Sequence, residues 1–258
     1  MVKRSDTLIR DAQRGAPVRI DGVTYWAGED LRVGQYVEVG PDNLVRAAID
    51  PKSHPDQATP IPPSTLTFTD DYVDETVRIL AALDFAAIET MAAHLALAKT
   101  IYIVGLGGSA ATASHAANDL RKLCGKNAIC PTDNTSLMTA LANDNSFDEW
   151  LVDWLELQEP CWDEEIILFL SVGGGSGKTS RALVRAAQTC RTLEGRIPVL
   201  AIVGRDGGEL ARLADCAIVI PNLFPERVTP HVEGLASVLL HLLVSHPALA
   251  KNPPTWRT

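Results

Sequence analysis

The segment Ile101-Tyr-Ile-Val-Gly105-Leu-Gly-Gly-Ser109 decides the fold of this chain, because it joins a short apolar strand to a glycine-rich turn. The residues that follow, Ala110 to Leu120, predict a helix that begins at this turn. Glycines let a ligand approach the backbone closely, and the amides at a helix start favour an anion such as phosphate. His115 and Asp119 are four residues apart on this helix, so both side chains face the same way. We therefore predict a phosphate-binding turn next to two proton-handling groups.

The composition limits the partners that this chain can have. It has 258 residues, 46% of them hydrophobic, and a formal net charge of -9, which argues against a nucleic-acid or anionic-membrane partner. Residues 1–6 lack the apolar core of a signal peptide, and no run approaches the roughly 20 apolar residues of a membrane span. We therefore expect a cytoplasmic protein in which backbone amides and hydroxyl groups hold any phosphate.

The five cysteines are widely spaced and form no C-x-x-C pair, which argues against a structural zinc knuckle or a redox motif. Buried free thiols are the simplest expectation. The cysteines are Cys124, Cys130, Cys161, Cys190 and Cys216.

The first 65 residues differ in pattern from the rest. Apolar and polar residues alternate around turn signals in 18–26 and 35–40, which predicts a small β-rich extension with hairpins. Five prolines between Pro51 and Pro63 predict an extended linker. We therefore expect an extension and linker over residues 1–65 and one larger domain over residues 66–258.

The larger domain alternates between helix and strand patterns. Residues 70–99 predict one long helix or two short ones, beginning at Asp70 and Asp71. Five strands are predicted after it, at residues 100–104, 128–131, 166–171, 199–203 and 216–220. Repeated βα units predict an α/β fold, with a five-stranded parallel sheet covered by helices on both faces and ligands at the carboxyl ends of its strands.

A second glycine loop, 171–180, follows the third predicted strand of this domain. It is not a nucleotide-binding P-loop, because Val172 stands where that motif needs a glycine five residues before Gly177. Its amides, with the hydroxyls of Ser171 and Ser176, suit the single phosphate of a sugar phosphate. A plain strand-to-helix turn is the alternative, and the presence of two such loops favours a ligand.

These segments, together with Asn143-Asp144 and 203–208, resemble the sugar isomerase (SIS) domain family over residues 70–245, and its phosphoheptose isomerase branch above all. The resemblance implies a flavodoxin-like three-layer sandwich and a homotetramer with active sites between subunits. It implies an aldose–ketose isomerase that converts sedoheptulose 7-phosphate into D-glycero-D-manno-heptose 7-phosphate without an organic cofactor.

The resemblance also assigns site residues by position. Those that would bind the substrate are Gly107, Gly108, Ser109, Asn143, Asp144, Ser171 and Ser176. Those that would bind a zinc ion are His115, Asp119, Glu233 and His241. Asp119 and His241 are the base and acid candidates, and Glu233 is able to exchange roles with Asp119. On a straight helix Glu233 and His241 lie about 12 Å apart along the axis, too far to share one ion unless the helix is irregular or subunits share ligands.

The chain departs from the family pattern at the site itself. Leu106 replaces an asparagine, Asp119 a glutamate and Glu233 a glutamine, and the second loop lacks two hydroxyls at Val172 and Gly173. These changes leave two alternatives open. One is an isomerase for another ketose phosphate, such as an octulose or hexulose phosphate of secondary metabolism. The other is a non-catalytic member that binds a sugar phosphate or a protein partner.

Overall fold

The computed structural model describes residues 63–158, 164–192 and 197–252, together with the backbone of five short strands between residues 5 and 47. The chain forms two compact units, Met1–Val73 and Asp74–Thr258. The predicted boundary between residues 65 and 66 lies shortly before this division and stays a prediction. Residues 51–62 of the predicted linker lie outside the described residues.

The first unit holds a five-stranded sheet in the order β1-β4-β5-β3-β2. Its strands are β1 (Ser5–Thr7), β2 (Pro17–Ile20), β3 (Val23–Ala27), β4 (Tyr36–Val39) and β5 (Leu44–Ala47). Strands β2 and β3 pair antiparallel with Val18 opposite Tyr25. This is the hairpin that the alternating pattern predicts.

The second unit is built on a sheet in the order β10-β9-β8-β6-β7, in which every pair is parallel. Its strands are β6 (Thr100–Gly105), β7 (Asn127–Ile129), β8 (Glu165–Ser171), β9 (Val199–Val203) and β10 (Cys216–Val219). The chain first moves from β6 to β7 and then returns to β8 on the other side of β6. Strand order therefore reverses between β6 and β8. The predicted five-stranded parallel sheet is confirmed.

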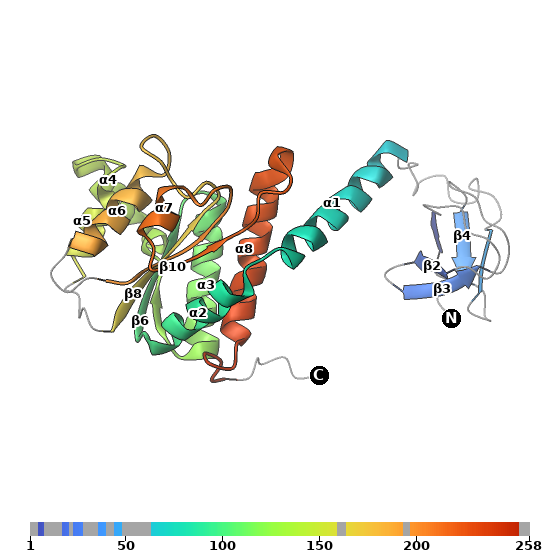
Figure 1. The fold of residues 1–258 in the computed structure, drawn as a ribbon, viewed down its shortest axis with the longest axis horizontal. Helices are drawn as coiled ribbons and strands as arrows, with labels where there is room; N and C mark the ends of the chain where they lie inside the picture. Colours follow the sequence, from blue (N-terminus) through green and yellow to red (C-terminus); the bar gives the residue numbers. More distant parts are fainter. Residues whose placement is uncertain are drawn as a thin grey trace. The chain divides into compact units, whose positions relative to one another are not determined.

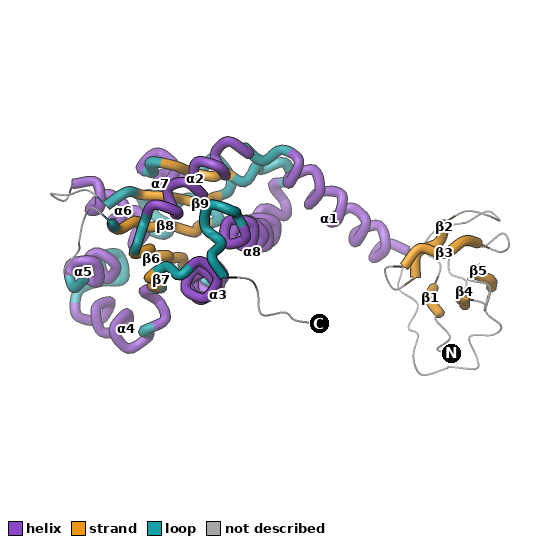
Figure 2. The backbone as a smooth tube through the Cα atoms, turned by 90° about the horizontal axis from the view of Figure 1, so that it is seen from below, coloured by secondary structure: helices purple, strands orange, loops and turns teal. Residues whose placement is uncertain are grey.

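Helices cover both faces of this sheet (Figure 1 and Figure 2). Helices α2 (Phe85–Leu97), α3 (Gly108–Cys124) and α8 (Val228–Ser245) share one core cluster, while α5 (Trp150–Glu156) and α6 (Arg181–Thr192) share the other. Strand β6 contributes side chains to both clusters, because successive residues of a strand point to opposite faces of the sheet. Ile101 and Ile103 belong to the first cluster, and Tyr102 and Val104 belong to the second. The elements α4 (Thr135–Asp144) and α7 (Gly208–Leu213) complete the second layer.

The helical stretch before β6 begins earlier than its sequence predicts. Helix α1 spans Pro63–Ala81, so the expectation of a start at Asp70 and Asp71 is wrong. Proline is well tolerated in a first helical turn, because the amide hydrogen it lacks has no partner there. A break then separates α1 from α2, whose first turn is capped by Asp84 Oδ1 accepting from the amide of Ala86 at 2.9 Å.

By length and composition, the segment Pro225–Ser245 reaches what a membrane-spanning helix needs, so the expectation that no segment does so is wrong. Helices α1 and α2 have the length and composition of a membrane span only when they are counted as one segment across a bend of 69°. Within Pro225–Ser245, the apolar residues Leu235, Leu239 and Leu243 are buried in the core cluster that α8 shares with α3. Packing against the sheet therefore accounts for the composition of α8.

The described cysteines agree with the expectation of buried free thiols. They are Cys124, Cys130, Cys190 and Cys216, while Cys161 lies outside the described residues. Burial raises the pKa of the Cys190 thiol to about 12, so this group stays protonated near neutral pH.

The loop after β8 and the turn after β9 are joined through their backbones. The amide of Leu210 donates to the carbonyl of Gly174 at 2.8 Å, and that of Glu209 donates to Gly175 at 3.1 Å. Gly174 has a φ of 67°, and a Cβ atom there would lie 1.9 Å from the carbonyl oxygen of Gly207. Only glycine permits this approach, so the two segments form one rigid surface at the edge of the sheet.

We expect Gly174→Ala to lower the free energy of unfolding by about 2–4 kcal/mol, because the methyl group meets backbone and the residue is held at positive φ. The control is Gly177→Ala in the same loop, where an added Cβ meets nothing within 4 Å. That variant should stay within about 0.5 kcal/mol of the wild type. Urea unfolding followed by circular dichroism measures both. Equal stability of the two variants would contradict the close approach.

A buried ion cluster attaches α1 to the start of α8. Glu75 is 5% exposed. Its carboxylate accepts a hydrogen bond from Nε of Arg227 at 2.7 Å and lies 2.8 Å from Nε2 of His231. Hydrogen bonding to Arg227 is the main cause that holds the pKa of Glu75 at about 2, below its ordinary 4.5, although burial acts in the opposite direction.

This cluster should make stability depend on pH in the acid range. Because the folded-state pKa of Glu75 is below the unfolded one, its stabilisation is complete above pH 4.5 and is lost as the pH falls towards 2. We expect the difference in unfolding free energy between the wild type and Glu75→Gln to be constant near neutral pH and to shrink across this window. The control is Glu89→Gln, which removes an exposed carboxylate paired with His246. A Glu75→Gln difference that does not change with pH would refute this role.

Candidate functional site

The candidate site lies where the strand order reverses, between β6 and β8. Gly105 pairs in register with Leu170, so the turn after β6 lies beside Ser171 at the carboxyl edge of the sheet. In open α/β sheets ligands bind at such a reversal point. Both predicted glycine loops are therefore adjacent at the place where this architecture accepts a ligand.

The first turn brings its backbone close to the start of α3. A Cβ atom on Gly105 would lie 2.6 Å from the backbone of Ser109, and Gly107 has a φ of 61°. No described side chain caps the first turn of α3 at Gly107. These early amides suit an anion.

The second loop uses part of its own polar groups. The hydroxyl of Ser176 accepts from the amides of Lys178 and Thr179, each at 3.2 Å. Ser171, at the end of β8, is 7% exposed. The assignment of both serines to phosphate binding stays a prediction.

Helices α3 and α8 bring three of the predicted metal and proton-transfer residues together. Nε2 of His115 lies 3.1 Å from Nε2 of His241 and 3.4 Å from Oδ2 of Asp119. Nε2 of His241 lies 3.7 Å from the same Oδ2 atom. Both imidazole side chains are 55% exposed, whereas that of Asp119 is only 15% exposed. The triad His115, Asp119 and His241 therefore presents two nitrogens and one oxygen to a common point at the surface.

This triad fits a zinc ion. A tetrahedral ion with bonds of about 2.0–2.2 Å separates its ligand atoms by roughly 3.3–3.6 Å, close to the three distances observed. Nδ1 of His241 lies 2.9 Å from the backbone carbonyl of Ser237, a contact that suits a ring which donates from Nδ1 and binds a metal through Nε2. Oδ1 of Asp119 accepts from Asn118 at 3.0 Å, so the second oxygen of this carboxylate is also held.

Glu233, the fourth predicted metal ligand, does not join the triad within this chain. Its carboxylate lies instead against Gly108, where an added Cβ would come within 2.6 Å of Oε1. The regular helix α8 accounts for this separation, as its rise per residue predicts. Glu233 therefore faces the first glycine turn, whereas His241 faces His115 about two turns further along.

The residues near α4 are arranged differently from the triad. Asn143 and Asp144 end α4, are exposed, and hydrogen bond to each other at 3.1 Å. Leu106, where the family pattern has an asparagine, packs against the core cluster to which Leu137 and Leu141 of α4 also attach. Burial of apolar surface therefore accounts for a leucine at position 106.

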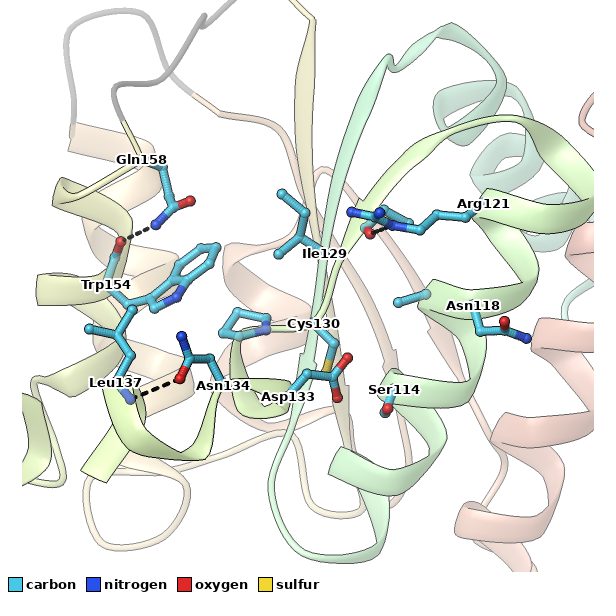
Figure 3. A pocket seen from close by; sticks show the side chains of 13 residues that line it. Ser114, Asn118, Arg121, Ile129, Cys130, Asp133, Asn134, Leu137, Trp154 and Gln158 are labelled. Carbon is cyan, nitrogen blue, oxygen red and sulfur yellow. Dashed lines mark hydrogen bonds between the residues drawn. The ribbon is translucent and has the colours of Figure 1, made fainter. Parts of the chain in front are cut away.

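A pocket of about 630 Å³ lies beside α3 and contains none of the predicted site residues. Ser114, Asn118 and Arg121 of α3 line it, with Asp133 and Asn134 from the segment that precedes α4. Figure 3 shows the Arg121 side chain extending from α3 towards Ile129. Asn118 also bonds to Asp119, so the pocket adjoins the triad. Sequence patterns did not identify this pocket, since its walls come from segments with no shared motif.

Similarity to known proteins places the chain in a family. The chain matches no family model. It is 32% identical to the phosphoheptose isomerase of Syntrophotalea carbinolica over 179 residues, which are 67% of this chain and 84% of that protein. The chain belongs to the phosphoheptose isomerase family. This similarity confirms the family to which the sequence motifs point.

A family member of known structure agrees with this fold, and a further relative carries a different name. The phosphoheptose isomerase GmhA from Neisseria gonorrhoeae superposes with a TM-score of 0.59 at 22% identity, over 69% of this chain and 96% of that one. The lincomycin biosynthesis protein LmbN of Streptomyces lincolnensis is 38% identical over 160 residues, 58% of this chain. The chain spans about half of that relative, 54% of its length.

Proposed function

We propose that this chain is an aldose–ketose isomerase that converts sedoheptulose 7-phosphate into D-glycero-D-manno-heptose 7-phosphate. The observation that carries the proposal is the convergence of His115, Asp119 and His241, in a member of this family, on the helix that starts at the glycine turn. A scaffold protein has no need of such a convergence. The enzyme works in the cytoplasm, without an organic cofactor and without a nucleic-acid or membrane partner.

The substrate lies along the carboxyl edge of the sheet. Its phosphate is held by the second loop through Ser171 and Ser176, and its sugar by Gly107, Gly108 and Ser109 of the first turn. Asn143 and Asp144 contact its hydroxyls. This orientation directs the carbonyl end of the sugar along α3.

The reaction moves one proton between adjacent carbons through an enediolate. A base removes the proton from C1 of the ketose, and the proton returns to C2 while the C1 hydroxyl becomes the aldehyde. Asp119 and Glu233 are the carboxylates available for the carbon proton, and His241 is the acid that serves the oxygens. Glu233 is supported in this role by its place against Gly108.

The same residues give the site its capacity for zinc. His115, Asp119 and His241 would hold the ion, and a bound zinc ion would supply Lewis-acid polarisation of the carbonyl oxygen. A nitrogen that binds zinc cannot also transfer a proton, so the two roles of His241 exclude each other. Glu233 reaches such an ion only from another subunit.

A homotetramer with sites between subunits supplies that contact. Val238 and Leu242, on either side of His241 along α8, are 47% and 42% exposed, and an interface there would cover both them and the imidazoles.

Sedimentation velocity should give four times the mass of one chain. A monomer would refute the shared site.

We expect the wild type to bind zinc, and Asp119→Asn to weaken that binding at least tenfold because it removes the charged ligand. The matched control is His246→Ala, which removes a histidine paired with Glu89 elsewhere. Competition with a chromogenic chelator measures the affinities. Equal zinc affinity in the wild type and Asp119→Asn would show that the triad is not the metal site. If the metal-free enzyme turns over at the wild-type rate, the triad acts in proton transfer alone.

Incubation with sedoheptulose 7-phosphate in deuterated water tests the reaction. We expect deuterium to appear at C2 of the product, because the transferred proton exchanges with solvent. Asp119→Asn and His241→Ala should each lower kcat by about 10²–10⁴-fold, while His246→Ala should leave it unchanged. Binding without turnover of any ketose phosphate would favour a non-catalytic sugar-phosphate-binding protein.

A second candidate is an isomerase for another ketose phosphate of secondary metabolism, such as an octulose or hexulose phosphate. Two observations favour it: the 38% identity to a lincomycin biosynthesis protein, and Leu106 at a position where the family pattern has a polar residue. Comparison of kcat/KM across ketose phosphates of six, seven and eight carbons distinguishes the two candidates.

A further inference from the structure

The turn between β9 and α7 holds an arginine in an unusual backbone conformation. Arg205 has a φ of 54°, in the left-handed region that disfavours residues with a side chain. Gly204 precedes it, and Gly207 and Gly208 follow it in the same turn. Strain at a non-glycine position of this turn points to a use for the side chain that the turn itself does not require.

The arginine side chain lies against the second glycine loop. The Cβ position of Gly173 is 3.8 Å from Nη1 of Arg205 and 3.9 Å from its Nε. Gly173 lies between Ser171 and Ser176, the two residues assigned to phosphate binding. The guanidinium therefore borders the surface on which the phosphate would rest.

The position of this turn is set by backbone contacts. The amides of Glu209 and Leu210 donate to the carbonyls of Gly175 and Gly174, and a Cβ on Gly208 would lie 2.5 Å from the carbonyl oxygen of Gly173. The turn that carries Arg205 and the loop that it borders cannot move independently.

Arg205 is also available for a ligand. It is exposed and makes no hydrogen bond or ion pair with any described residue. Arg181 and Arg185 of this unit differ in this respect, since Arg181 pairs with Asp148 at 3.3 Å and Arg185 with Glu149 at 2.8 Å. An exposed guanidinium, which stays charged at all physiological pH values, has the geometry to donate two parallel hydrogen bonds to a phosphate.

We propose that Arg205 is a substrate-binding residue that contacts the phosphate group at the loop 171–180. The inference rests on the proposed function for its ligand class, a sugar phosphate. It adds a positive charge to a site whose hydroxyls are few and where Ser176 is engaged within its own loop. In a chain with a net charge of -9, this local cation offsets the repulsion that a phosphate dianion meets.

Inorganic phosphate is the probe, with line broadening in ³¹P NMR as the measurement. We expect Arg205→Gln to weaken phosphate binding about 10–100-fold, as loss of a charge-assisted hydrogen bond predicts. Arg205→Lys should recover part of the affinity. The matched control is Arg212→Gln, which removes an exposed arginine from α7. This variant should bind phosphate within twofold of the wild type.

Arg205→Gly separates binding from a structural role. Glycine adopts this φ without strain, so the unfolding midpoint should not fall, whereas phosphate affinity should drop as in Arg205→Gln. A wild type that does not bind phosphate, or an Arg205→Gln variant that binds it within twofold of the wild type, overturns the inference. A lower unfolding midpoint for Arg205→Gly overturns it too, since the arginine would then be structural.

Kinetics distinguish this inference from the proposed function. With the ketose phosphate as substrate, Arg205→Gln should raise KM and change kcat little, because the phosphate is bound alike in the ground and transition states. If phosphate binding depends on Arg205 while no ketose phosphate is turned over, the isomerase proposal fails and the inference stands.

Discussion

The parallel hydrogen-bonded pairing of β6 with β8 is the constraint on which the rest of the site depends. It places Gly105 beside Leu170, and so the two glycine loops emerge next to each other at one edge of the sheet. Helix α3 can begin only where the first loop ends, and the second loop can be held only by the turn that follows β9. A shift of register between the two strands would separate the second glycine loop from the first turn and from helix α3.

The sequence predicts those parts of the structure that follow a hydrophobic period or a short motif. The strands, the glycine loops and the pair His115 and Asp119 follow from hydrophobic runs and from spacing on a helix. Helical rise also anticipated that Glu233 and His241 face different places. By contrast, α1 begins at Pro63, ahead of Asp70 and Asp71. The sequence pattern does not reveal this start, because proline is typical both of a linker and of a first helical turn.

Contacts between residues that lie far apart in the sequence could not be predicted from hydrophobic periods or motifs. Arg205 looks like an ordinary turn residue until its φ and its approach to Gly173 are known. The buried Glu75 reaches His231 across more than half of the chain, and no spacing rule connects them. The apolar run of α8 satisfies the composition of a membrane span, and only its packing in the core shows another reason for it.

Helix α3 begins at the glycine turn and carries His115 two turns later, so the helix fixes the distance between the two. Its rise sets the distance between Gly108 and His115 at about 10 Å, and a regular helix neither stretches nor shortens. A ligand anchored at one end must therefore match that length to place its carbonyl at the other. For the proposed substrates, a preference for a longer or shorter sugar would therefore come from the loops and from side chains such as Leu106, because the length of the helix is fixed.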